Sequence, residues 1–163
     1  MNYKVIFESE RINFVKVSTD LAQNYLDMLN DKDVQKCISH ETKVYSYDGE
    51  IKWINNKLAN NDIIYSMIEK DTNEYIGNIE LMHINDGIGE FGIAITPSKQ
   101  NKHYGEESIK AFMDYVCNKL NLDGLDLYVY DFNIRAIKCY EKVGFKIVGK
   151  GKTDDEIHMM IRK

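Results

Sequence analysis

A change of hydrophobic period near residue 62 constrains the fold of this chain more than any other feature. Apolar residues recur at every second position in three segments, 63–70, 75–84 and 90–95, which polar turn sequences separate. The pattern predicts three consecutive antiparallel strands. The pair Asp86 and Gly87 favours a tight turn before the third strand, and Pro97 follows that strand, where a missing N–H does little harm.

A long helix is predicted after these strands, and it decides how the next strand pairs. Gly124 lies just past the expected end of the helix, and the apolar residues at helical spacing are Ile109, Phe112, Met113, Val116 and Leu120. Residues 125–131 then read as another strand. A strand–helix–strand unit over residues 90–131 implies a parallel pair of strands with a right-handed crossover.

The flanking segments complete a mixed sheet. Residues 11–17 alternate as a first strand, and segments 18–31, 31–38 and 47–61 have helical spacing. Residues 145–150 and 156–163 predict a final pair of strands around a polar turn. We therefore expect an α+β (mixed α/β) fold, with a mostly antiparallel central sheet of about seven strands and helices on both faces, in a single domain over residues 1–163.

The composition argues against several classes of function. The chain has 163 residues, 44% hydrophobic and 29% charged, with a net charge of −5. These values are ordinary for a globular domain, and the acidic balance argues against nucleic-acid binding while mildly suiting a cationic partner. No apolar run is long enough for a signal peptide or a membrane span, so we expect a cytoplasmic protein without a membrane partner.

Three cysteines, Cys37, Cys117 and Cys139, are odd in number and show no CxxC spacing. They indicate neither a disulfide framework nor a zinc site, and we expect no bound metal. Buried, reduced thiols are the expected state.

The segment "NIRAIKCYEKVGF", residues 133–145, predicts a helix with two polar side chains on its inward face. Asn133 is a good N-cap residue, and Gly144 suits a left-handed C-terminal position. Offsets of three and four place Ala136, Ile137 and Tyr140 on the same side as Asn133. Tyr140 either packs its ring and points its hydroxyl at water or a carbonyl, or faces a ligand together with Asn133. The segment alone favours packing.

The polar junction "TPSKQNKHYGEES", residues 96–108, is a second candidate ligand site. Free N–H groups at about residues 100–105, with the helix dipole behind them, would form an anion cradle to which Lys99 and Lys102 could add charge. Glu106 and Glu107 would repel a phosphate that faced them. On these residues alone, a solvated connection is the simpler interpretation.

Together, these two stretches resemble the acyl-coenzyme A site of the GNAT acetyltransferase superfamily. The motif NxxAxxxYxxxGF is present as Asn133, Ala136, Tyr140, Gly144 and Phe145. The sequence "QNKHYG" is similar to the family loop Q/R-x-x-G-x-G/A, with Gln100 first and Gly105 last. His103 stands where the family usually has glycine. Because histidine is comparatively well tolerated at positive φ, the loop can keep its shape, and His103 would contact a phosphate, weaken coenzyme binding or have no role.

The resemblance extends over nearly the whole chain. Residues 8–18 and 76–97 are similar to the start and the central strands of the branch that contains ribosomal-protein-alanine and spermidine N-acetyltransferases. This implies a GNAT-type fold and transfer of acetyl from acetyl-coenzyme A to a small-molecule or peptide amine. A non-catalytic module that binds acyl-coenzyme A as a sensor is the alternative. The exposed edges of a mixed sheet also allow a homodimer.

The resemblance also implies roles for individual residues. A tyrosine at the Tyr140 position protonates or stabilises the departing thiolate in this family, and Asn133 would contact the pantetheine arm. The backbone of residues 93–95 would pair with the pantetheine amides at the sheet edge. The implied coenzyme-binding residues are Ile93, Ala94, Ile95, Gln100, Asn101, Lys102, His103, Tyr104, Gly105, Glu106, Asn133, Ala136 and Tyr140.

Two carboxylates are candidates for the acceptor side. Alternation places Glu90 on one strand face with Gly92 and Ala94, which leaves room for a substrate, so Glu90 is the first candidate to deprotonate the amine, directly or through water. Glu80 is either an outward carboxylate or a pocket residue. Related polyamine enzymes have acidic residues at similar places, which makes both candidate contacts for a cationic acceptor.

Overall fold

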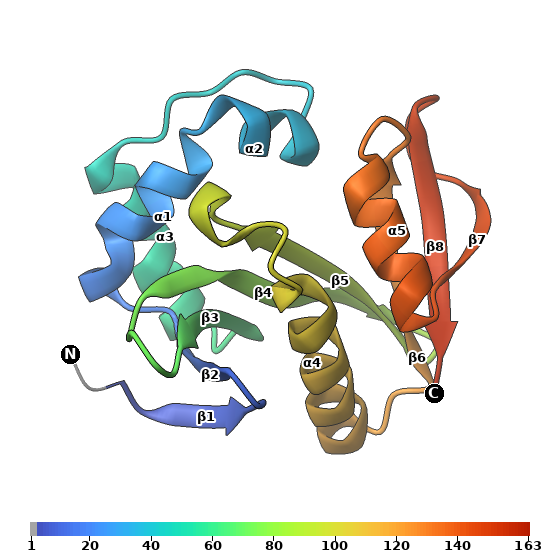
Figure 1. The fold of residues 1–163 in the computed structure, drawn as a ribbon, viewed down its shortest axis with the longest axis horizontal. Helices are drawn as coiled ribbons and strands as arrows, with labels where there is room; N and C mark the ends of the chain where they lie inside the picture. The colour runs from blue at the N-terminus through green and yellow to red at the C-terminus, as the bar shows by residue number, and fades with distance from the viewer. Residues whose placement is uncertain (1–2) are drawn as a thin grey trace. The chain divides into compact units, whose positions relative to one another are not determined.

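The computed structural model describes residues 3–163, which form an eight-stranded sheet and five α-helices (Figure 1). The strands are β1 (Val5–Glu8), β2 (Ile12–Lys16), β3 (Ile64–Glu69), β4 (Tyr75–Asn85), β5 (Ile88–Ile95), β6 (Gly124–Tyr130), β7 (Lys146–Lys150) and β8 (Glu156–Arg162). The helices are α1 (Ala22–Leu29), α2 (Lys32–Ile38), α3 (Tyr47–Ala59), α4 (Tyr104–Leu120) and α5 (Ile134–Val143), with short 3-10 turns η1 (Thr19–Leu21) and η2 (Pro97–Lys99).

The strands are hydrogen-bonded in the order β1-β2-β3-β4-β5-β6-β8-β7, and only the β5–β6 pairing is described as parallel. The predicted mixed, mostly antiparallel fold is confirmed. The sheet has one strand more than expected because β1 was not predicted. The three consecutive apolar residues of β1 do not alternate with polar residues, so the sequence pattern does not indicate a strand. The segment pairs with β2, where Phe7 stacks on Phe14 with ring centroids 4.2 Å apart.

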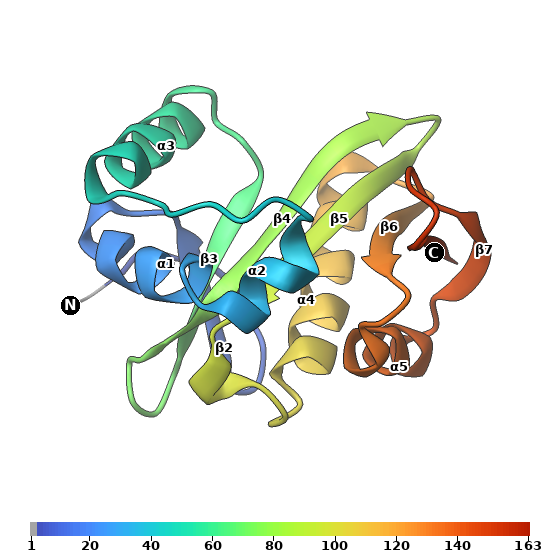
Figure 2. The same ribbon diagram turned by 90° about the horizontal axis from the view of Figure 1, so that it is seen from above.

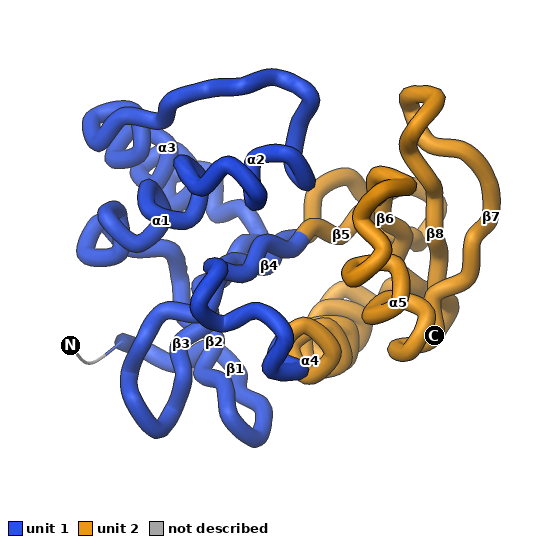
Figure 3. The backbone as a smooth tube through the Cα atoms, turned by 45° about the horizontal axis from the view of Figure 1, so that its top comes forward, with its two compact units in different colours: residues 1–80, 93–104 blue, residues 81–92, 105–163 orange. Residues whose placement is uncertain are grey.

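The chain divides into two compact units (Figure 3). The first contains residues 3–80 and 93–104, and the second contains residues 81–92 and 105–163. Strands β4 and β5 each contribute residues to both units. No helix among residues 3–163 is both long and apolar enough to cross a membrane.

In the first unit, helices α1 and α3 lie side by side and cover strands β2 to β4 (Figures 1 and 2). The three predicted helices of this region are confirmed, and Ser18, Asp31 and Ser46 each accept a hydrogen bond from a nearby backbone N–H at a helix start. Tyr25 and Ile54 are fully buried in the core between these helices and the sheet. Apolar helix faces therefore hold this unit together.

In the second unit, α4 and α5 pack on the face of β5 that carries Phe91. The Phe91 ring lies 6.2 Å from the Phe112 ring of α4 and 6.0 Å from the Tyr140 ring of α5. The predicted parallel pair is confirmed, because Ile88–Glu90 of β5 pairs with Gly124–Asp126 of β6 in parallel register. Antiparallel pairing of β6 with β8, and of β8 with β7, completes this unit.

Several residues with left-handed backbone bear on the predicted turns and helix ends. Asp86 (φ 51°) and Gly87 (φ 79°) form the expected turn, and Gly144 (φ 123°) ends α5. The end of α4 differs, since Asn121 (φ 54°) takes the left-handed position expected near Gly124. Gly124 lies instead in β6, where a Cβ atom would meet the backbone oxygen of Ile161 at 2.2 Å. Close strand approach therefore explains that glycine.

The three thiols are free, but they are not equally buried. Cys117 is 1% exposed, as predicted, whereas Cys37 and Cys139 are half-buried. Burial raises the pKa of both Cys117 and Cys139 above its ordinary value, so these two thiols remain protonated at neutral pH.

Candidate functional site

The loop between η2 and α4 has left-handed backbone at two positions even though it lacks the glycine usual in the family. Both Asn101 (φ 61°) and His103 (φ 66°) adopt left-handed backbone, and both are exposed. These are the residue types that best tolerate this conformation after glycine. His103 therefore keeps the backbone conformation for which a glycine is normally needed, and Lys102 lies between the two left-handed residues.

Gln100, expected at the pyrophosphate, uses its side chain for the loop itself. Its Nε2 donates a hydrogen bond to the backbone oxygen of Ile95 at 2.9 Å. This bond ties the start of the loop to the end of β5. Ile93, Ala94 and Ile95 are all half-buried, and they lie beyond Glu90, the last β5 residue in the parallel pairing with β6.

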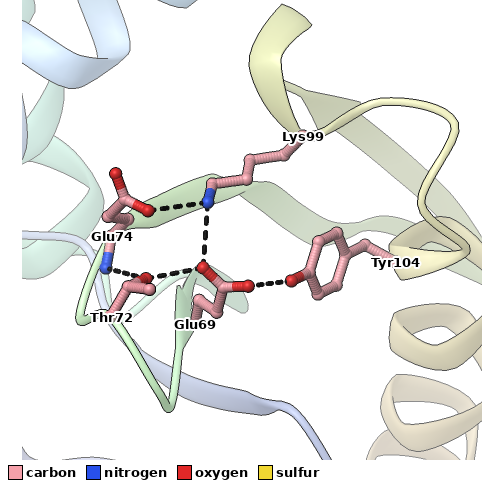
Figure 4. Close-up of polar contacts among 5 residues, drawn as sticks. All are labelled: Glu69, Thr72, Glu74, Lys99 and Tyr104. Carbon is pink, nitrogen blue, oxygen red and sulfur yellow. Dashed lines mark hydrogen bonds and ion pairs between the residues drawn. The ribbon is translucent and has the colours of Figure 1, made fainter.

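Lys99, which was considered as a further charge for the anion cradle, is paired with two carboxylates instead. Its side chain is 10% exposed and donates hydrogen bonds to Glu69 and Glu74, each at 2.9 Å (Figure 4). Tyr104, at the start of α4, donates its hydroxyl to the other oxygen of Glu69, and Thr72 donates to Glu69 at 2.5 Å. We call these five residues the Glu69 cluster. It joins the β3–β4 hairpin to both ends of the loop at residues 100–103.

The Glu69 cluster favours ionised Glu69. Hydrogen bonds from Thr72, Tyr104 and Lys99, in that order, lower the pKa of Glu69 to about 2. Hydrogen bonds from Lys99 to Glu69 and Glu74 raise the pKa of Lys99 above its ordinary value, against the opposing effect of burial. The Tyr104 ring is 4% exposed and lies under the guanidinium of Arg11, with Cζ 4.1 Å from the ring centroid. Because the Tyr104 side chain is engaged in this way, Tyr104 could contact a pyrophosphate only through its backbone.

Glu106, expected near the coenzyme, is paired with lysines in the second unit. Its carboxylate lies 3.3 Å from Lys142 Nζ of α5 and 3.6 Å from Lys110 Nζ of α4. Desolvation raises the pKa of Glu106, but the two lysines together outweigh it and leave the pKa below its ordinary value. The first turn of α4 therefore has its negative charge partly neutralised, which reduces the expected repulsion of a phosphate.

On α5, the ring of Tyr140 packs against the aromatic residues of the second unit. The half-buried ring meets Phe91 edge-on and lies 5.9 Å from Phe145, so the predicted packing describes the ring well. Asn133 was expected to cap the helix, yet within the described chain its side chain makes no capping hydrogen bond. Ala136 is half-buried and Ile137 is buried, as the helical spacing predicts.

The two candidate carboxylates lie in different units. Glu80, in the first unit, is 3.8 Å from Lys57 Nζ and its side chain is 29% exposed. Glu90, in the second unit, is 16% exposed and lies 3.4 Å from His83 Nδ1 and 3.6 Å from Lys152 Nζ. Because successive strand residues face opposite sides, Glu90 faces away from the side on which Phe91 contacts Tyr140.

Sequence analysis missed a polar group beside Glu90. Asp126, the β6 residue in register with Glu90, lies 2.8 Å from His158 Nε2 of β8. The His158 ring stacks on Tyr128, with centroids 4.5 Å apart. Alternation in β6 places Asp126 and Tyr128 on one face, but only the pairing of β6 with β5 and β8 shows that they neighbour Glu90 and His158.

Comparisons with known proteins agree with these features. A family model described as the acetyltransferase (GNAT) domain matches residues 11–146. Spermidine N(1)-acetyltransferase of Escherichia coli (strain K12) is 39% identical over 79 residues, 47% of this chain and 42% of that protein, so the chain spans less than half of this relative. Acetyltransferase PseH of Campylobacter jejuni is 24% identical over 140 residues, 86% of each chain.

Solved structures share the fold at low sequence identity. A GNAT-family acetyltransferase from Bacillus anthracis has a TM-score of 0.85 at 20% identity and covers 95% of this chain and 96% of its own. Spermidine N-acetyltransferase from Vibrio cholerae, solved with CoA and spermine, has a TM-score of 0.80 at 24% identity, with 93% and 95% covered. The family match includes the loop and the α5 motif through Phe145. The chain therefore belongs to the GNAT acetyltransferase family, as the two motifs predicted.

Proposed function

We propose that this chain is an N-acetyltransferase that moves the acetyl group of acetyl-coenzyme A to a primary amine, and that residues 1–163 act as one acetyltransferase domain. The acceptor is a small-molecule amine such as a polyamine, or a protein N-terminus. The relatives named for spermidine support the polyamine class. The exposed edge strand β7 also allows a homodimer.

One observation carries the proposal. In the second unit, adjacent residues of β5 present a carboxylate, Glu90, on one face and a ring, Phe91, that positions Tyr140 on the other. An acyl transfer to an amine needs a base for the ammonium proton and an acid for the leaving sulfur. Glu90 of β5 would be the base, and Tyr140 of α5, which packs against Phe91 on the opposite face of the same strand, would be the acid.

The chemistry follows from these two groups. Glu90, directly or through water, accepts a proton from the acceptor ammonium, and the free amine attacks the thioester carbon. The C–N bond forms as the C–S bond breaks, and the Tyr140 hydroxyl donates a proton to the departing thiolate. Backbone N–H groups of the loop at residues 100–105 would hold the pyrophosphate, and Asn133 and Ala136 would border the pantetheine arm.

The resident contacts of Glu90 favour a second candidate, a module that binds acyl-coenzyme A without turnover. His83 and Lys152 already lie within 3.4 and 3.6 Å of the carboxylate, so the proposed base is partly occupied. In such a module Tyr140 would contribute only to packing.

Mass-spectrometric detection of acetylated product tests the proposal. The acceptor panel contains spermidine, spermine, an aminoglycoside, amino acids and short peptides with free N-termini. We expect acetylation of one class, and Tyr140→Phe should lower turnover about 100- to 10,000-fold at unchanged coenzyme affinity, because general acid catalysis contributes factors of this order.

Tyr115→Phe is the matched control, since it removes a tyrosine hydroxyl of α4 that accepts a hydrogen bond from Lys119 at 3.1 Å. Turnover should stay at the wild-type level in this variant. Absence of product from every acceptor, with coenzyme binding retained, would support the binding module. Absence of coenzyme binding would refute both candidates.

A further inference from the structure

A lysine side chain, Lys152, lies beside Glu90, the proposed base. Lys152, in the turn between β7 and β8, places its Nζ 3.6 Å from Glu90 Oε1 and 4.6 Å from the centroid of the Tyr128 ring. A carboxylate and an aromatic face together form a typical binding site for an alkylammonium ion. The groups that contact Lys152 would therefore also suit the ammonium group of a ligand.

The turn that carries Lys152 is held by its own backbone. The Lys152 N–H donates to Glu156 Oε1 at 2.7 Å, and the Gly151 N–H donates to the Glu156 backbone oxygen at 2.6 Å. A Cβ atom at Gly151 would meet Glu156 Cγ at 2.6 Å and Glu156 Cβ at 2.8 Å, so a larger residue at this position would displace Glu156. The approach of Lys152 to Glu90 is thus supported by the hairpin geometry.

The surrounding charges leave Glu90 as the carboxylate for this ammonium. Asp126 is engaged by His158 at 2.8 Å, and the His158 ring covers Tyr128 by stacking at 4.5 Å. His83 is the other group within reach of Glu90, and its side chain is 80% exposed. Lys152 and His83 both contact Oε1 of Glu90, so an acceptor ammonium at this oxygen would compete with Lys152.

We propose that Glu90 and the Tyr128 ring form the ammonium site of the acceptor, and that Lys152 fills this site until an acceptor displaces it. This inference rests on the proposed acetyltransferase function and names its acceptor class, an alkyl primary ammonium. In this site the Tyr128 ring would favour a cationic ligand, and Lys152 would be an intramolecular competitor of the acceptor.

The competition is weak enough for a substrate to overcome. The Lys152 side chain is 62% exposed, and ion pairs of such exposure change an equilibrium by at most about fivefold. Lys152→Ala should therefore lower the KM of the cationic acceptor about two- to fivefold and leave the KM of acetyl-coenzyme A unchanged.

Lys150→Ala is the matched control, because it removes the same charge from an exposed position at the end of β7. It should change neither KM. Equal changes in the two lysine variants would show only a general electrostatic attraction and would overturn the proposal. Tyr128→Leu should raise the acceptor KM several-fold, whereas Tyr128→Phe keeps the ring and should restore the wild-type value.

Calorimetric titration with spermidine tests the site without turnover. Tighter binding to Lys152→Ala than to wild type and Lys150→Ala supports the ammonium site even if no acetylated product is found. Binding that is equal in all three, or absent from all three, refutes it. Absence of acetylated product from wild type with every acceptor refutes the proposed function and leaves this binding comparison intact, so the two failures are distinguishable.

Discussion

Replacing Glu69 by glutamine removes the charge at the centre of the Glu69 cluster while keeping the shape of the side chain. Glu69 accepts hydrogen bonds from Lys99, Thr72 and Tyr104, and its side chain is 18% exposed. Lys99, which is 10% exposed, would keep only Glu74 as a charged partner among the contacts described. The variant therefore leaves a nearly buried ammonium under-compensated.

The expected cost lies between two limits. Breaking a buried ion pair costs about 3–5 kcal/mol, and breaking an exposed one costs about 0–1 kcal/mol. Since the Glu69–Lys99 pair is mostly but not wholly buried, we expect Glu69→Gln to lower the free energy of unfolding by about 2–3 kcal/mol. Glu74 lies at the same 2.9 Å from Lys99, but its side chain is 60% exposed. Glu74→Gln should therefore cost less than about 1 kcal/mol.

Urea denaturation at pH 7 measures both variants, and the acetyl-coenzyme A KM reports the loop. Because Lys99 and Tyr104 flank the left-handed residues Asn101 and His103, Glu69→Gln should also raise this KM several-fold while kcat changes little. Equal losses of stability in the two variants, or a loss below about 0.5 kcal/mol in Glu69→Gln, would refute the reasoning that burial decides the value of each pair.

The remaining predictions concern pH, a buried acid and the loop. Folding holds the pKa of Glu69 at about 2, below its ordinary value of 4.5, so the stability that Glu69 contributes is present above pH 4.5 and lost as the pH falls towards 2. In an acid denaturation series, the free energy of unfolding of wild type should fall towards that of Glu69→Gln over this pH range. Glu50 is 3% exposed, its Oε1 has no hydrogen-bond partner in the described chain, and burial raises its pKa despite the opposing charge of Lys43. The stability that Glu50 contributes is therefore full below its ordinary pKa and lost as the pH rises through the raised pKa. Glu50→Gln should be more stable than wild type at pH 7 by on the order of 1 kcal/mol, and urea denaturation at pH 4 should show no difference. His103→Gly should relieve about 1 kcal/mol of backbone strain at φ 66° and lower the acetyl-coenzyme A KM, and an unchanged or raised KM would show that the imidazole itself contributes to binding.

Patterns of local spacing were sufficient for most of the secondary structure and for the family. Helix α5 was predicted from its spacing and from Gly144, and the parallel pair was predicted from a strand–helix–strand order. These features depend on residues that are close in sequence, or on a topological rule that nearly every fold obeys. Strand β1 was missed for the opposite reason, since a four-residue segment becomes a strand only through its pairing with β2.

The sequence by itself determined every helix, all strands but β1, the two motifs and the positive-φ tolerance of His103. Tertiary structure alone decided what each polar side chain does. It engages Lys99 with Glu69 and Glu74, ties Gln100 to Ile95, and brings Lys152 to Glu90 across 62 positions of chain. Such contacts depend on strand register and on how a side chain is desolvated by distant neighbours. Neither quantity has a period or a spacing in the sequence, because both arise only when segments far apart in the chain are packed together.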